Sequence, residues 1–427
     1  MFVTDDQRAT ETLGVMPKTR RLFGAGGVRY PNAFATTPLC CPSRSTIFTG
    51  RYAHNTGVHK NFVPKSFDTT TMFTRLLREN GYRTALVGKF LNGWPHDKAP
   101  PYFDKWAVGG AYVDPIFNVN GSFVSRRGYV TTLTKGYSLR FLRGFETHDS
   151  APWLLYVATR APHYPWPAES RFADAPVAPW SGNPAVFERD RSDKPAYVRG
   201  FDYSISGGRR VREAQLRTLM SVDDMVGTIF STLGALGERK KTLAFFLSDN
   251  GYTWTEHHLG GDRGTAGQKG LPYTASVTLP FLVRWPGVLP AGTRDRRLAG
   301  TVDIAPTILE AAGIPPDPTK PPLDGRSLLE PSVRTRMLLE YWHERDRGIP
   351  TWTSTRTRDY QYIETYGSDG TTIVFREYYD LRDDPWQLRN LLRDGDPSNN
   401  PDIAALSAQL AQDHVCAGVG SGPTPCP

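Results

Sequence analysis

The stretch TTPLCCPSRSTIFTGRYAHNTG, residues 36–57, places two of the chain's four cysteines side by side, just before a proline, a serine and an arginine. Cys40 and Cys41 are too close for an easy disulfide and lack the spacing of a zinc site. Pro42 predicts the beginning of a helix, because an early helical position needs no backbone N–H donor. Cys40 would then lie at the helix N-terminus, where anions are favoured. Taken alone, the pattern fits a buried cysteine pair equally well.

Composition excludes several classes of protein. The chain has 427 residues, is 39% hydrophobic and 22% charged, and carries a formal charge of +8, as expected for a globular protein with a basic surface. No basic run is interleaved with aromatic residues, so we expect no nucleic-acid partner, and no apolar segment has the length of a membrane span. A disulfide between Cys416 and Cys426, favoured over two free thiols, would indicate an oxidising compartment.

Strand-like and helix-like segments alternate through the first three quarters of the chain, which favours an α/β core with a large, mostly parallel sheet between helices. The expected strands are 82–90, the beginning of 151–165, 241–252 and 279–287, and the expected helices are 69–81, 213–238 and 303–313. Residues 175–210 are expected to form a long polar loop that could border a site. The α/β domain is predicted to span residues 1–325.

The pattern changes after the proline-rich segment 314–325. Three stretches, 336–342, 353–367 and 371–381, have the composition of consecutive antiparallel strands, and two more, 387–394 and 402–414, are expected to be helical. Residues 326–427 are therefore predicted to form a smaller α+β domain, with an antiparallel sheet, a terminal helix and a tail closed by cysteines.

Several polar residues directly follow the expected strands: Asp5, Asp6, Lys89, His163, Asp249 and Asn250. In open parallel sheets, ligands bind at the carboxyl ends of the strands, so we expect these side chains to meet at one edge. The three carboxylates and the amide are hard oxygen donors, which suit calcium or magnesium rather than zinc. Each pair alone would also fit an ordinary solvated turn.

Further side chains in the chain are cationic or can become so: Arg44, Lys89, His163, His257 and Lys269. One divalent ion beside several cations suits a tetrahedral oxyanion ester, whose charge has to be stabilised in the transition state.

With these residues in place, the motif CCPSRSTIFTGR, residues 40–51, resembles the signature C-x-P-S-R-x-x-x-x-T-G-R of the sulfatase family. The segment GYRTALVGK (81–89) resembles the second signature of that family, and SDNG (248–251) resembles its metal-binding motif. The resemblance continues through APHYP (161–165) and QKGLPY (268–273) to REYYDLRDDPWQLRNLL (376–392), so it covers nearly the whole chain.

The resemblance implies an alkaline phosphatase-like fold and a sulfuric ester hydrolase whose Cys40 is converted to formylglycine by a maturation enzyme. It implies one Ca2+ per chain, with these ligands: Asp5, Asp6, residue 40, Asp249 and Asn250. Arg44 would stabilise the modified residue, three further residues would hold the sulfate, namely Lys89, His163 and Lys269, and His257 or Lys269 would be the general acid. The hydrated aldehyde would supply the nucleophile.

Two departures from the family pattern are visible. Many arylsulfatases have a histidine where this chain has Leu91, and the GKFLN form (88–92) instead resembles the N-acetylglucosamine-6-sulfatase and heparan-sulfate endosulfatase branch. The family's tyrosine-glutamate pair after the motif lysine is here Tyr273-Thr274, so that acid is absent.

We therefore predict hydrolysis of sulfate monoesters, with a sulfated amino sugar or glycan as the natural substrate class. Two alternatives stay open: a phosphonate monoester or phosphodiester hydrolase, and a non-catalytic polyanion-binding protein. No signal peptide is visible, although MFVTDDQ (1–7) begins inside an expected strand and an upstream piece could be missing. A secreted or periplasmic location is expected, with a cytoplasmic one still possible.

Overall fold

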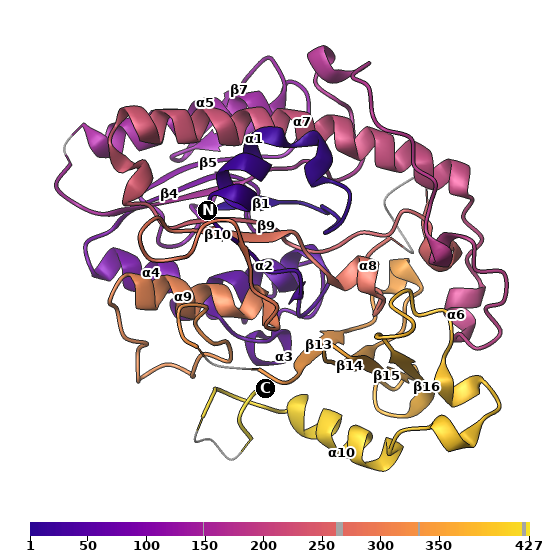
Figure 1. The fold of residues 1–427 in the computed structure, drawn as a ribbon. Helices are drawn as coiled ribbons and strands as arrows, with labels where there is room; N and C mark the ends of the chain where they lie inside the picture. The colour runs from indigo at the N-terminus through magenta and orange to yellow at the C-terminus, as the bar shows by residue number, and fades with distance from the viewer. Residues whose placement is uncertain (148, 262–267, 332–333, 421–423) are drawn as a thin grey trace.

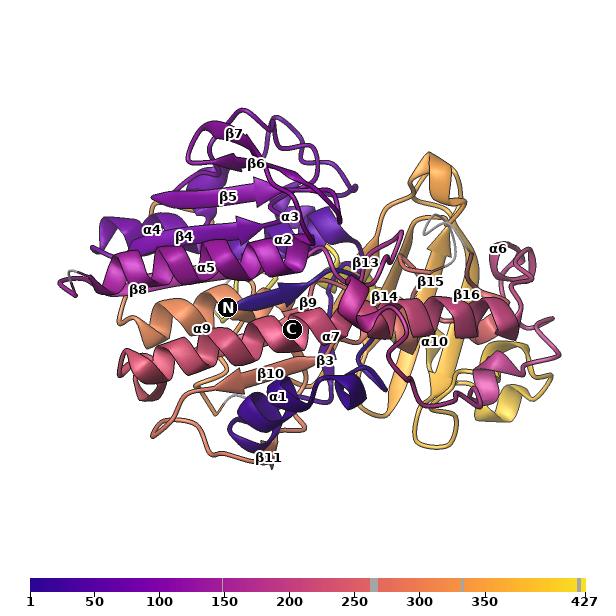
Figure 2. The same ribbon diagram turned by 90° about the horizontal axis from the view of Figure 1, so that it is seen from above.

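A computed structural model of the chain describes residues 1–147, 149–261, 268–331, 334–420 and 424–427. Its centre is a ten-stranded mixed sheet with the order β11-β2-β10-β9-β1-β8-β4-β5-β6-β7 (Figures 1 and 2). The strands are β1 (Phe2–Thr4), β2 (Val28–Arg29), β4 (Arg83–Gly88), β5 (Lys105–Gly109), β6 (Ile116–Val119), β7 (Ser122–Ser125), β8 (Trp153–Ala158), β9 (Ala244–Ser248), β10 (Phe281–Arg284) and β11 (Thr293–Arg294). The central strands β9, β1, β8, β4 and β5 run parallel, whereas β10, β6 and β7 pair antiparallel with their neighbours. The predicted fold class is confirmed.

Helices cover both faces of this sheet (Figure 1). One face carries α5 (Val130–Glu146) and α7 (Ile205–Ala235), and the other carries α2 (Cys40–Thr49), α4 (Phe73–Glu79) and α9 (Ile304–Ala311). Successive residues of a strand point to opposite faces, so Phe2 packs in the core beneath α5 and α7, while Val3 packs in the core beneath α2 and α9. Strands buried on both faces explain the continuous apolar runs in the sequence.

A second, four-stranded antiparallel sheet lies beside the large one (Figure 2). Its strands are β13 (Met337–Tyr341), β14 (Trp352–Arg356), β15 (Tyr360–Tyr366) and β16 (Ile373–Asp380), and α10 (Ile403–Asp413) packs on it. A two-stranded sheet pairs β3 (Ala33–Phe34) with β12 (Ala299–Gly300), and the short helices are α1 (Pro17–Thr19), α3 (Ala53–Thr56), α6 (Ala196–Arg199) and α8 (Thr274–Val277). The predicted antiparallel sheet and terminal helix are confirmed.

Two expected helices differ from the structure. The helix expected from residue 213 begins at Ile205, where the side chain of Ser204 caps it. Gly208 in its first turns allows a close approach to the segment of Trp254, since a Cβ on Gly208 would lie 1.7 Å from the Trp254 carbonyl oxygen. The prediction of a helix at 387–394 is wrong, because the structure has only a single 3-10 turn there, Leu391–Arg393. Gln387 adopts a left-handed backbone conformation (φ 60°), and its side chain accepts a hydrogen bond from the Thr274 N–H.

The cysteine-closed tail is also present, since Cys416 and Cys426 form a disulfide. Among the described residues, no helix combines the length and the apolar character that crossing a bilayer requires.

Candidate active site

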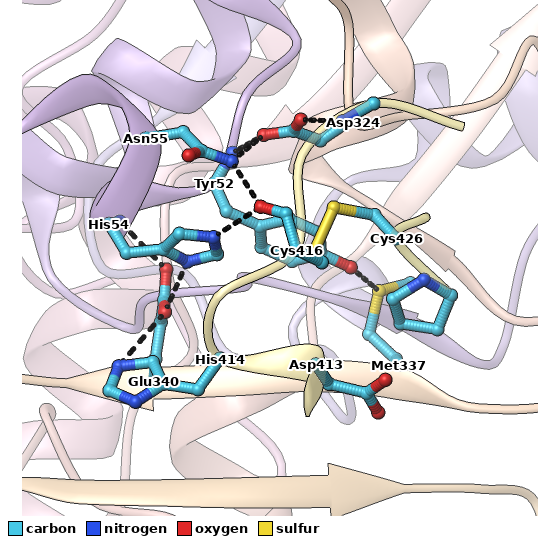
Figure 3. Close-up of a disulfide and its surroundings, with 12 residues drawn as sticks. Tyr52, His54, Asn55, Asp324, Met337, Glu340, Asp413, His414, Cys416 and Cys426 are labelled. Atoms are coloured by element: carbon cyan, nitrogen blue, oxygen red, sulfur yellow. Dashed lines mark hydrogen bonds and ion pairs between the residues drawn. A yellow bond between two sulfur atoms is a disulfide. The ribbon is translucent and has the colours of Figure 1, made fainter. Parts of the chain in front are cut away.

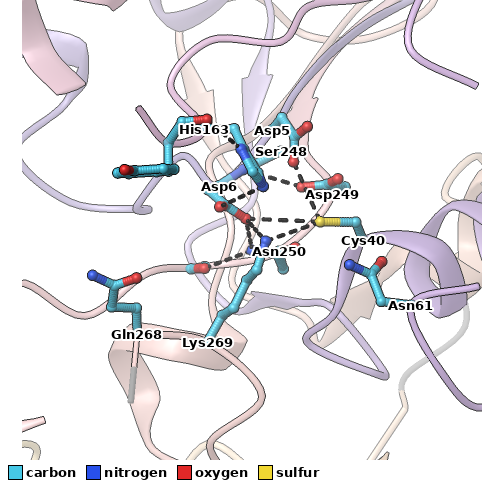
Figure 4. Close-up of polar contacts among 12 residues, drawn as sticks. Asp5, Asp6, Cys40, Asn61, His163, Ser248, Asp249, Asn250, Gln268 and Lys269 are labelled. Carbon is cyan, nitrogen blue, oxygen red and sulfur yellow. Dashed lines mark hydrogen bonds and ion pairs between the residues drawn. The ribbon is translucent and has the colours of Figure 1, made fainter. Parts of the chain in front are cut away.

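The helix that begins with the double cysteine, α2, is buried along its whole length. Its first residue is Cys40, as predicted, and Gly50 ends it in a left-handed conformation (φ 65°). The N–H of Cys41 donates to Oδ1 of Asn61 (3.1 Å), so one of the free donors of the first turn has a side-chain partner. Cys40 therefore has a fixed position, and its Sγ points into a group of carboxylates (Figure 4).

Those carboxylates come from the ends of two neighbouring parallel strands. Asp5 and Asp6 follow β1, and Asp249 and Asn250 follow β9, with Thr4 and Ser248 in register across the pair. The N–H of Asp249 donates to the carbonyl of Thr4 (3.0 Å), and the N–H of Asp6 donates to Oδ1 of Asp249 (3.1 Å). Ligand atoms of Asp5, Asp6, Cys40 and Asp249 all lie within 4.8 Å of one another. The strand-end prediction is confirmed for these residues.

Each carboxylate of this group has one close cation. Lys89 Nζ lies 2.6 Å from Asp5 Oδ2, Lys269 Nζ lies 2.5 Å from Asp6 Oδ1, and Arg44 Nε lies 2.8 Å from Asp249 Oδ2. Lys269 Nζ is also 3.0 Å from Cys40 Sγ. Three negative and three positive side chains thus surround the sulfur, and we call these seven residues together with Asn250 the Cys40 cluster.

The position of Lys89 depends on a close contact between two strands. The N–H of Lys89 donates to the carbonyl of Ala158 at the end of β8 (2.9 Å). Gly88 precedes it with a φ of 101°, and a Cβ there would lie 1.8 Å from the same carbonyl oxygen. Only glycine allows this approach, so the family-like sequence Gly88-Lys89 has a direct structural reason.

The crowding of charge shifts the pKa values of this cluster in different directions. Burial acts to raise the pKa of Asp5, but Lys89 and the other nearby cations hold it well below its ordinary value. Burial and the neighbouring charge of Asp5 raise the pKa of Asp249 to about 6. Burial, with a further contribution from Asp5, raises the pKa of the Cys40 thiol to about 12. Three buried carboxylates this close repel one another, so each depends on the cation beside it.

The residues fit a divalent cation. The side chain of Asn250 is fully buried, its Nδ2 donates to Asp6 Oδ1 (2.7 Å), and its Oδ1 has no hydrogen-bond partner among the described residues. An orphaned buried carbonyl oxygen beside three carboxylates is a donor set for a hard cation such as Ca2+.

His163 lies at the side of the same group. Its Nδ1 lies 2.7 Å from the carbonyl oxygen of Tyr164, which can only accept, so this nitrogen carries a proton. The Nε2 atom then faces Asp6, 3.9 Å from Oδ2. Burial lowers the pKa of His163, although Asp5 and Asp6 act in the opposite direction.

His257, the remaining predicted residue, has different neighbours. Its Nδ1 lies 2.7 Å from Glu188 Oε2, and its ring packs on Tyr273 with 4.5 Å between centroids. None of these contacts is with the Cys40 cluster. His257 instead lines a cavity of about 200 Å³, together with Arg8, Glu256 and Tyr273.

Sequence reasoning missed the residues that connect this region to the second sheet. The N–H of Asn61 donates to Glu344, which also forms an ion pair with Arg347 (2.8 Å between Nε and Oε2). The charge of Arg347 is close enough to affect Lys269 and Cys40. Glu344 and Arg347 lie between β13 and β14, and no motif in the sequence marks them.

The large sheet carries a donor set for a hard cation and a helix-borne cysteine at the carboxyl ends of its strands. This combination is typical of hydrolases with an alkaline phosphatase-like fold. The sulfatase family profile matches residues 3–314, and the profile described as N-sulphoglucosamine sulphohydrolase, C-terminal, matches residues 265–415. The chain belongs to the sulfatase family.

Two relatives illustrate how far the similarity extends. The chain is 31% identical to the extracellular sulfatase SULF-1 homolog of Drosophila melanogaster over 80% of its own length and 32% of that protein. It is 28% identical to N-acetylglucosamine-6-sulfatase of Homo sapiens over 98% of its length and 84% of that protein. The chain thus spans only a third of the first relative, and 48% of a Caenorhabditis elegans homologue.

Solved structures share the fold. A protein in complex with its substrate D-glucosamine-2-N,6-O-disulfate superimposes with a TM-score of 0.82 at 22% identity, over 96% of both chains. The phosphonate monoester hydrolase of Agrobacterium radiobacter superimposes with a TM-score of 0.71 at 20% identity, over 96% of this chain and 93% of that one.

Proposed function

We propose that the protein hydrolyses sulfate monoesters, with formylglycine at position 40 and one Ca2+ bound by Asp5, Asp6, Asp249 and Asn250. The observation that carries this proposal is the Cys40 cluster itself, in which a cysteine of the family signature lies beside a donor set for a hard cation. The hydrated formylglycine would supply a hydroxyl nucleophile, and the bound Ca2+ would activate it and add two positive charges. The three carboxylates are already balanced by three cations, so those two charges are free to attract an anionic ester.

The side chains of the protein then divide the remaining work. Lys89 and Lys269 would neutralise charge on the terminal oxygens of a sulfate group, with His163 beside them. Arg44 has a different role. Its Nε donates to Oδ2 of Asp249 (2.8 Å) and its Nη1 donates to the carbonyl of Lys89 (3.2 Å), so it holds both residues in position. Arg44 is fully buried, which fits a role in orienting ligands.

A sulfated amino sugar is the proposed substrate class. The resemblance of GKFLN to the N-acetylglucosamine-6-sulfatase branch supports it, as does the similarity to the human enzyme of that name along nearly the whole chain. A secreted or extracytoplasmic location is supported by the disulfide and by the extracellular sulfatases among the relatives. A formylglycine-generating maturation enzyme is a required partner.

The second candidate is phosphonate monoester hydrolysis, because a hydrolase of that class shares the fold. Net charge does not separate the two, since each ester carries one negative charge. Geometry favours the sulfate. A sulfate monoester offers three terminal oxygens to Lys89, Lys269 and His163, whereas a phosphonate or phosphate ester of one negative charge has a second substituent in place of one of these oxygens.

The modification is tested first. We expect the tryptic peptide from Tyr30 to Arg44 of active protein, made with a maturation enzyme, to contain formylglycine at position 40 and an unchanged thiol at Cys41. Mass spectrometry distinguishes the two directly. An active preparation whose peptide carries only the Cys40 thiol contradicts the proposed mechanism.

The reaction is tested by a panel of esters. We expect kcat/KM to be higher for p-nitrophenyl sulfate and 6-sulfated N-acetylglucosamine than for phenylphosphonate esters, and to fall about 10^4-fold or more in Cys40→Ala. A preference for the phosphonate would establish the second candidate. Modified protein that turns over none of these esters would favour a polyanion-binding protein.

A further inference from the structure

The segment that follows α3 brings one asparagine to the beginning of α2. Oδ1 of Asn61 accepts a hydrogen bond from the N–H of Cys41 (3.1 Å), so this side chain lies one residue away from Cys40. The contact also determines how the amide is oriented, since a backbone N–H can only donate and therefore has to meet the oxygen. The nitrogen of the Asn61 amide, Nδ2, is consequently directed elsewhere.

This nitrogen faces the Cys40 cluster. Figure 4 shows the Asn61 amide beside Cys40, with Nδ2 rather than Oδ1 on the side of the Cys40 side chain. Among the described residues, none accepts a hydrogen bond from Nδ2, and Asn61 is partly exposed. An amide that is fixed at its oxygen and open at its two N–H donors is arranged to bind an acceptor on a ligand.

The backbone around Asn61 is held as well. The N–H of Asn61 donates to Oε1 of Glu344, in the turn between β13 and β14. The N–H of Val63 donates to the carbonyl of Asn92 (2.9 Å), which also accepts from Sγ of Cys41 (3.6 Å). The loop is thus fastened to α2, to the segment after β4 and to the second sheet.

Glu344 has a partner of its own in that turn. Its second oxygen, Oε2, lies 2.8 Å from Nε of Arg347, and the side chains of Glu344 and Arg347 are only 16% and 12% exposed. An ionised carboxylate is a strong acceptor for a backbone N–H. The second sheet therefore supplies an anchor for the residue whose amide faces Cys40.

The donors of Asn61 differ from those of the neighbouring lysines. Lys89 and Lys269 are engaged in ion pairs with Asp5 and Asp6, at 2.6 Å and 2.5 Å. Nδ2 of Asn61 has no such commitment among the described residues. A sulfur atom under attack from position 40 has to approach the nucleophile to about 3–3.5 Å, which brings its terminal oxygens within reach of a donor beside Cys40.

We infer that Asn61 is a further catalytic residue, which donates from Nδ2 to a terminal oxygen of the sulfuryl group, and that Glu344 is the positioning residue that holds it there; this rests on the proposed function. The hydrogen bond orients the sulfuryl group toward the nucleophile, and no proton is transferred. Glu344 acts through Asn61 and does not touch the substrate.

Two substitutions separate donation from support of the helix. Asn61→Ala removes the donor and also the acceptor for the Cys41 N–H, whereas Asn61→Asp keeps an acceptor but, when ionised, cannot donate. We expect both variants to lower kcat/KM about 10- to 100-fold, to the same extent for p-nitrophenyl sulfate and 6-sulfated N-acetylglucosamine, and to raise the inhibition constant of inorganic sulfate about tenfold. Kinetics of Asn61→Asp close to those of the wild type, or a loss confined to the sugar sulfate, overturns the inference.

A structural role for Asn61 is tested on the same variants. Formylglycine content and the stabilisation by Ca2+ should be unchanged in Asn61→Ala, and a loss of either together with activity overturns the catalytic role. Asn55→Ala is the matched control, because Nδ2 of Asn55 donates to Asp324 Oδ2 (2.8 Å) and to the Cys416 carbonyl (2.8 Å), outside the Cys40 cluster. It should lower stability and leave the kcat/KM of folded protein unchanged.

The positioning role of Glu344 is tested by a double-variant cycle. Glu344→Ala should lower kcat/KM about tenfold on both esters, and it should have no further kinetic effect when added to Asn61→Ala, because it acts through Asn61. A further loss of the same size in the double variant overturns the positioning role. Wild-type protein that is active on none of the esters would instead refute the proposed function.

Discussion

Two buried polar clusters of this protein look alike in composition and differ in how their charges are satisfied. The Cys40 cluster gathers carboxylates from two strand ends around a sulfur (Figure 4). The second cluster lies around His54 and Glu340, where the short helix α3 meets β13 and the disulfide-closed tail (Figure 3). Both join segments that are far apart in the sequence. Within the described part of the chain, the first contains a buried oxygen without a partner, Asn250 Oδ1, whereas no such atom belongs to His54 or Glu340.

In the second cluster each acceptor has a donor. Glu340 Oε2 lies 2.8 Å from Nδ1 of His54, and Oε1 accepts from the backbone N–H of His54 (3.2 Å). Nε2 of His54 lies 2.9 Å from the carbonyl of Cys416, so both ring nitrogens face acceptors and the ring suits its protonated form. Asp324 accepts from the N–H groups of Tyr52 (2.8 Å) and Gly418 (2.7 Å).

The difference teaches how to separate a reactive cluster from a structural one. Glu340 and His54 balance each other's charge, and both oxygens of Glu340 and both ring nitrogens of His54 have partners. Around Cys40, three carboxylates are crowded, Asn250 Oδ1 has no hydrogen-bond partner among the described residues, and burial together with the charge of Asp5 raises the pKa of Asp249. An unpartnered buried carbonyl oxygen is costly, and beside three carboxylates it completes a donor set that a hard cation would satisfy.

The largest expected effect follows from removing one of the crowded carboxylates. Asp249→Asn keeps the size of the side chain but weakens the cation site, so we expect kcat/KM to fall about 10^3-fold or more. Ca2+ at about 100 times its dissociation constant should stabilise the wild type by about 2.7 kcal/mol and the variant far less. Thermal melts with Ca2+ and with a chelator measure this difference.

Glu340→Gln is the matched control for that experiment. It also removes a buried negative charge, but from the satisfied cluster, so it should lower stability while the stabilisation by Ca2+ and the kcat/KM of folded protein stay unchanged. A Ca2+ response that survives in Asp249→Asn, or disappears in Glu340→Gln, contradicts the assignment of the two clusters.

The next effect concerns pH. Burial acts to lower the pKa of His54, but Glu340 and the carbonyl of Cys416 raise it to about 9, from an ordinary value of 6.5. A raised pKa means that the folded state holds the proton more tightly, so this stabilisation is complete below pH 6.5 and is lost as pH rises through 9. It amounts to about 3 kcal/mol.

Denaturant titrations of the wild type and Glu340→Gln between pH 6 and 10 isolate this contribution, because other titrating groups are common to both proteins. The difference in unfolding free energy should shrink as pH rises. A difference that stays constant across this range would show that His54 is not the titrating partner of Glu340.

The Cys40 cluster could be predicted from the sequence because it follows from local rules. Parallel strands deliver their final residues to one edge, which places Asp5 beside Asp249, and a helix N-terminus faces them. Lys89 follows an expected strand in the same way, and the resemblance to the sulfatase family adds Lys269 to the site. The alternating pattern of apolar runs likewise predicted the central strands β4, β8, β9 and β10 and the helices α4, α7 and α9, but it did not predict α5 or the outer strands β2, β5, β6, β7 and β11.

The second cluster and the partner of His257 could not be predicted, because their contacts depend on packing between distant segments. His54 and Glu340 are separated by 286 residues, and Glu188 lies 69 residues before His257 in a stretch without periodicity. The wrong prediction of a helix at 387–394 has a similar cause. Gln387 accepts a hydrogen bond from the Thr274 N–H, and local propensity does not encode this contact.

The smallest expected effect concerns the tail that completes the satisfied cluster. The disulfide closes a loop with a sequence separation of 10 between Cys416 and Cys426, and the Cys416 carbonyl accepts from His54 Nε2 (2.9 Å) and Asn55 Nδ2 (2.8 Å). Replacing both cysteines by serine should cost about 2–3 kcal/mol of unfolding free energy through the more flexible unfolded chain. Folded protein should keep its kcat/KM and its Ca2+ response, because the described part of the tail bonds to α3 and forms no hydrogen bond or ion pair with the Cys40 cluster. Denaturant titration and ester kinetics of the double variant test both parts, and a loss of Ca2+ response would show that the two clusters are coupled.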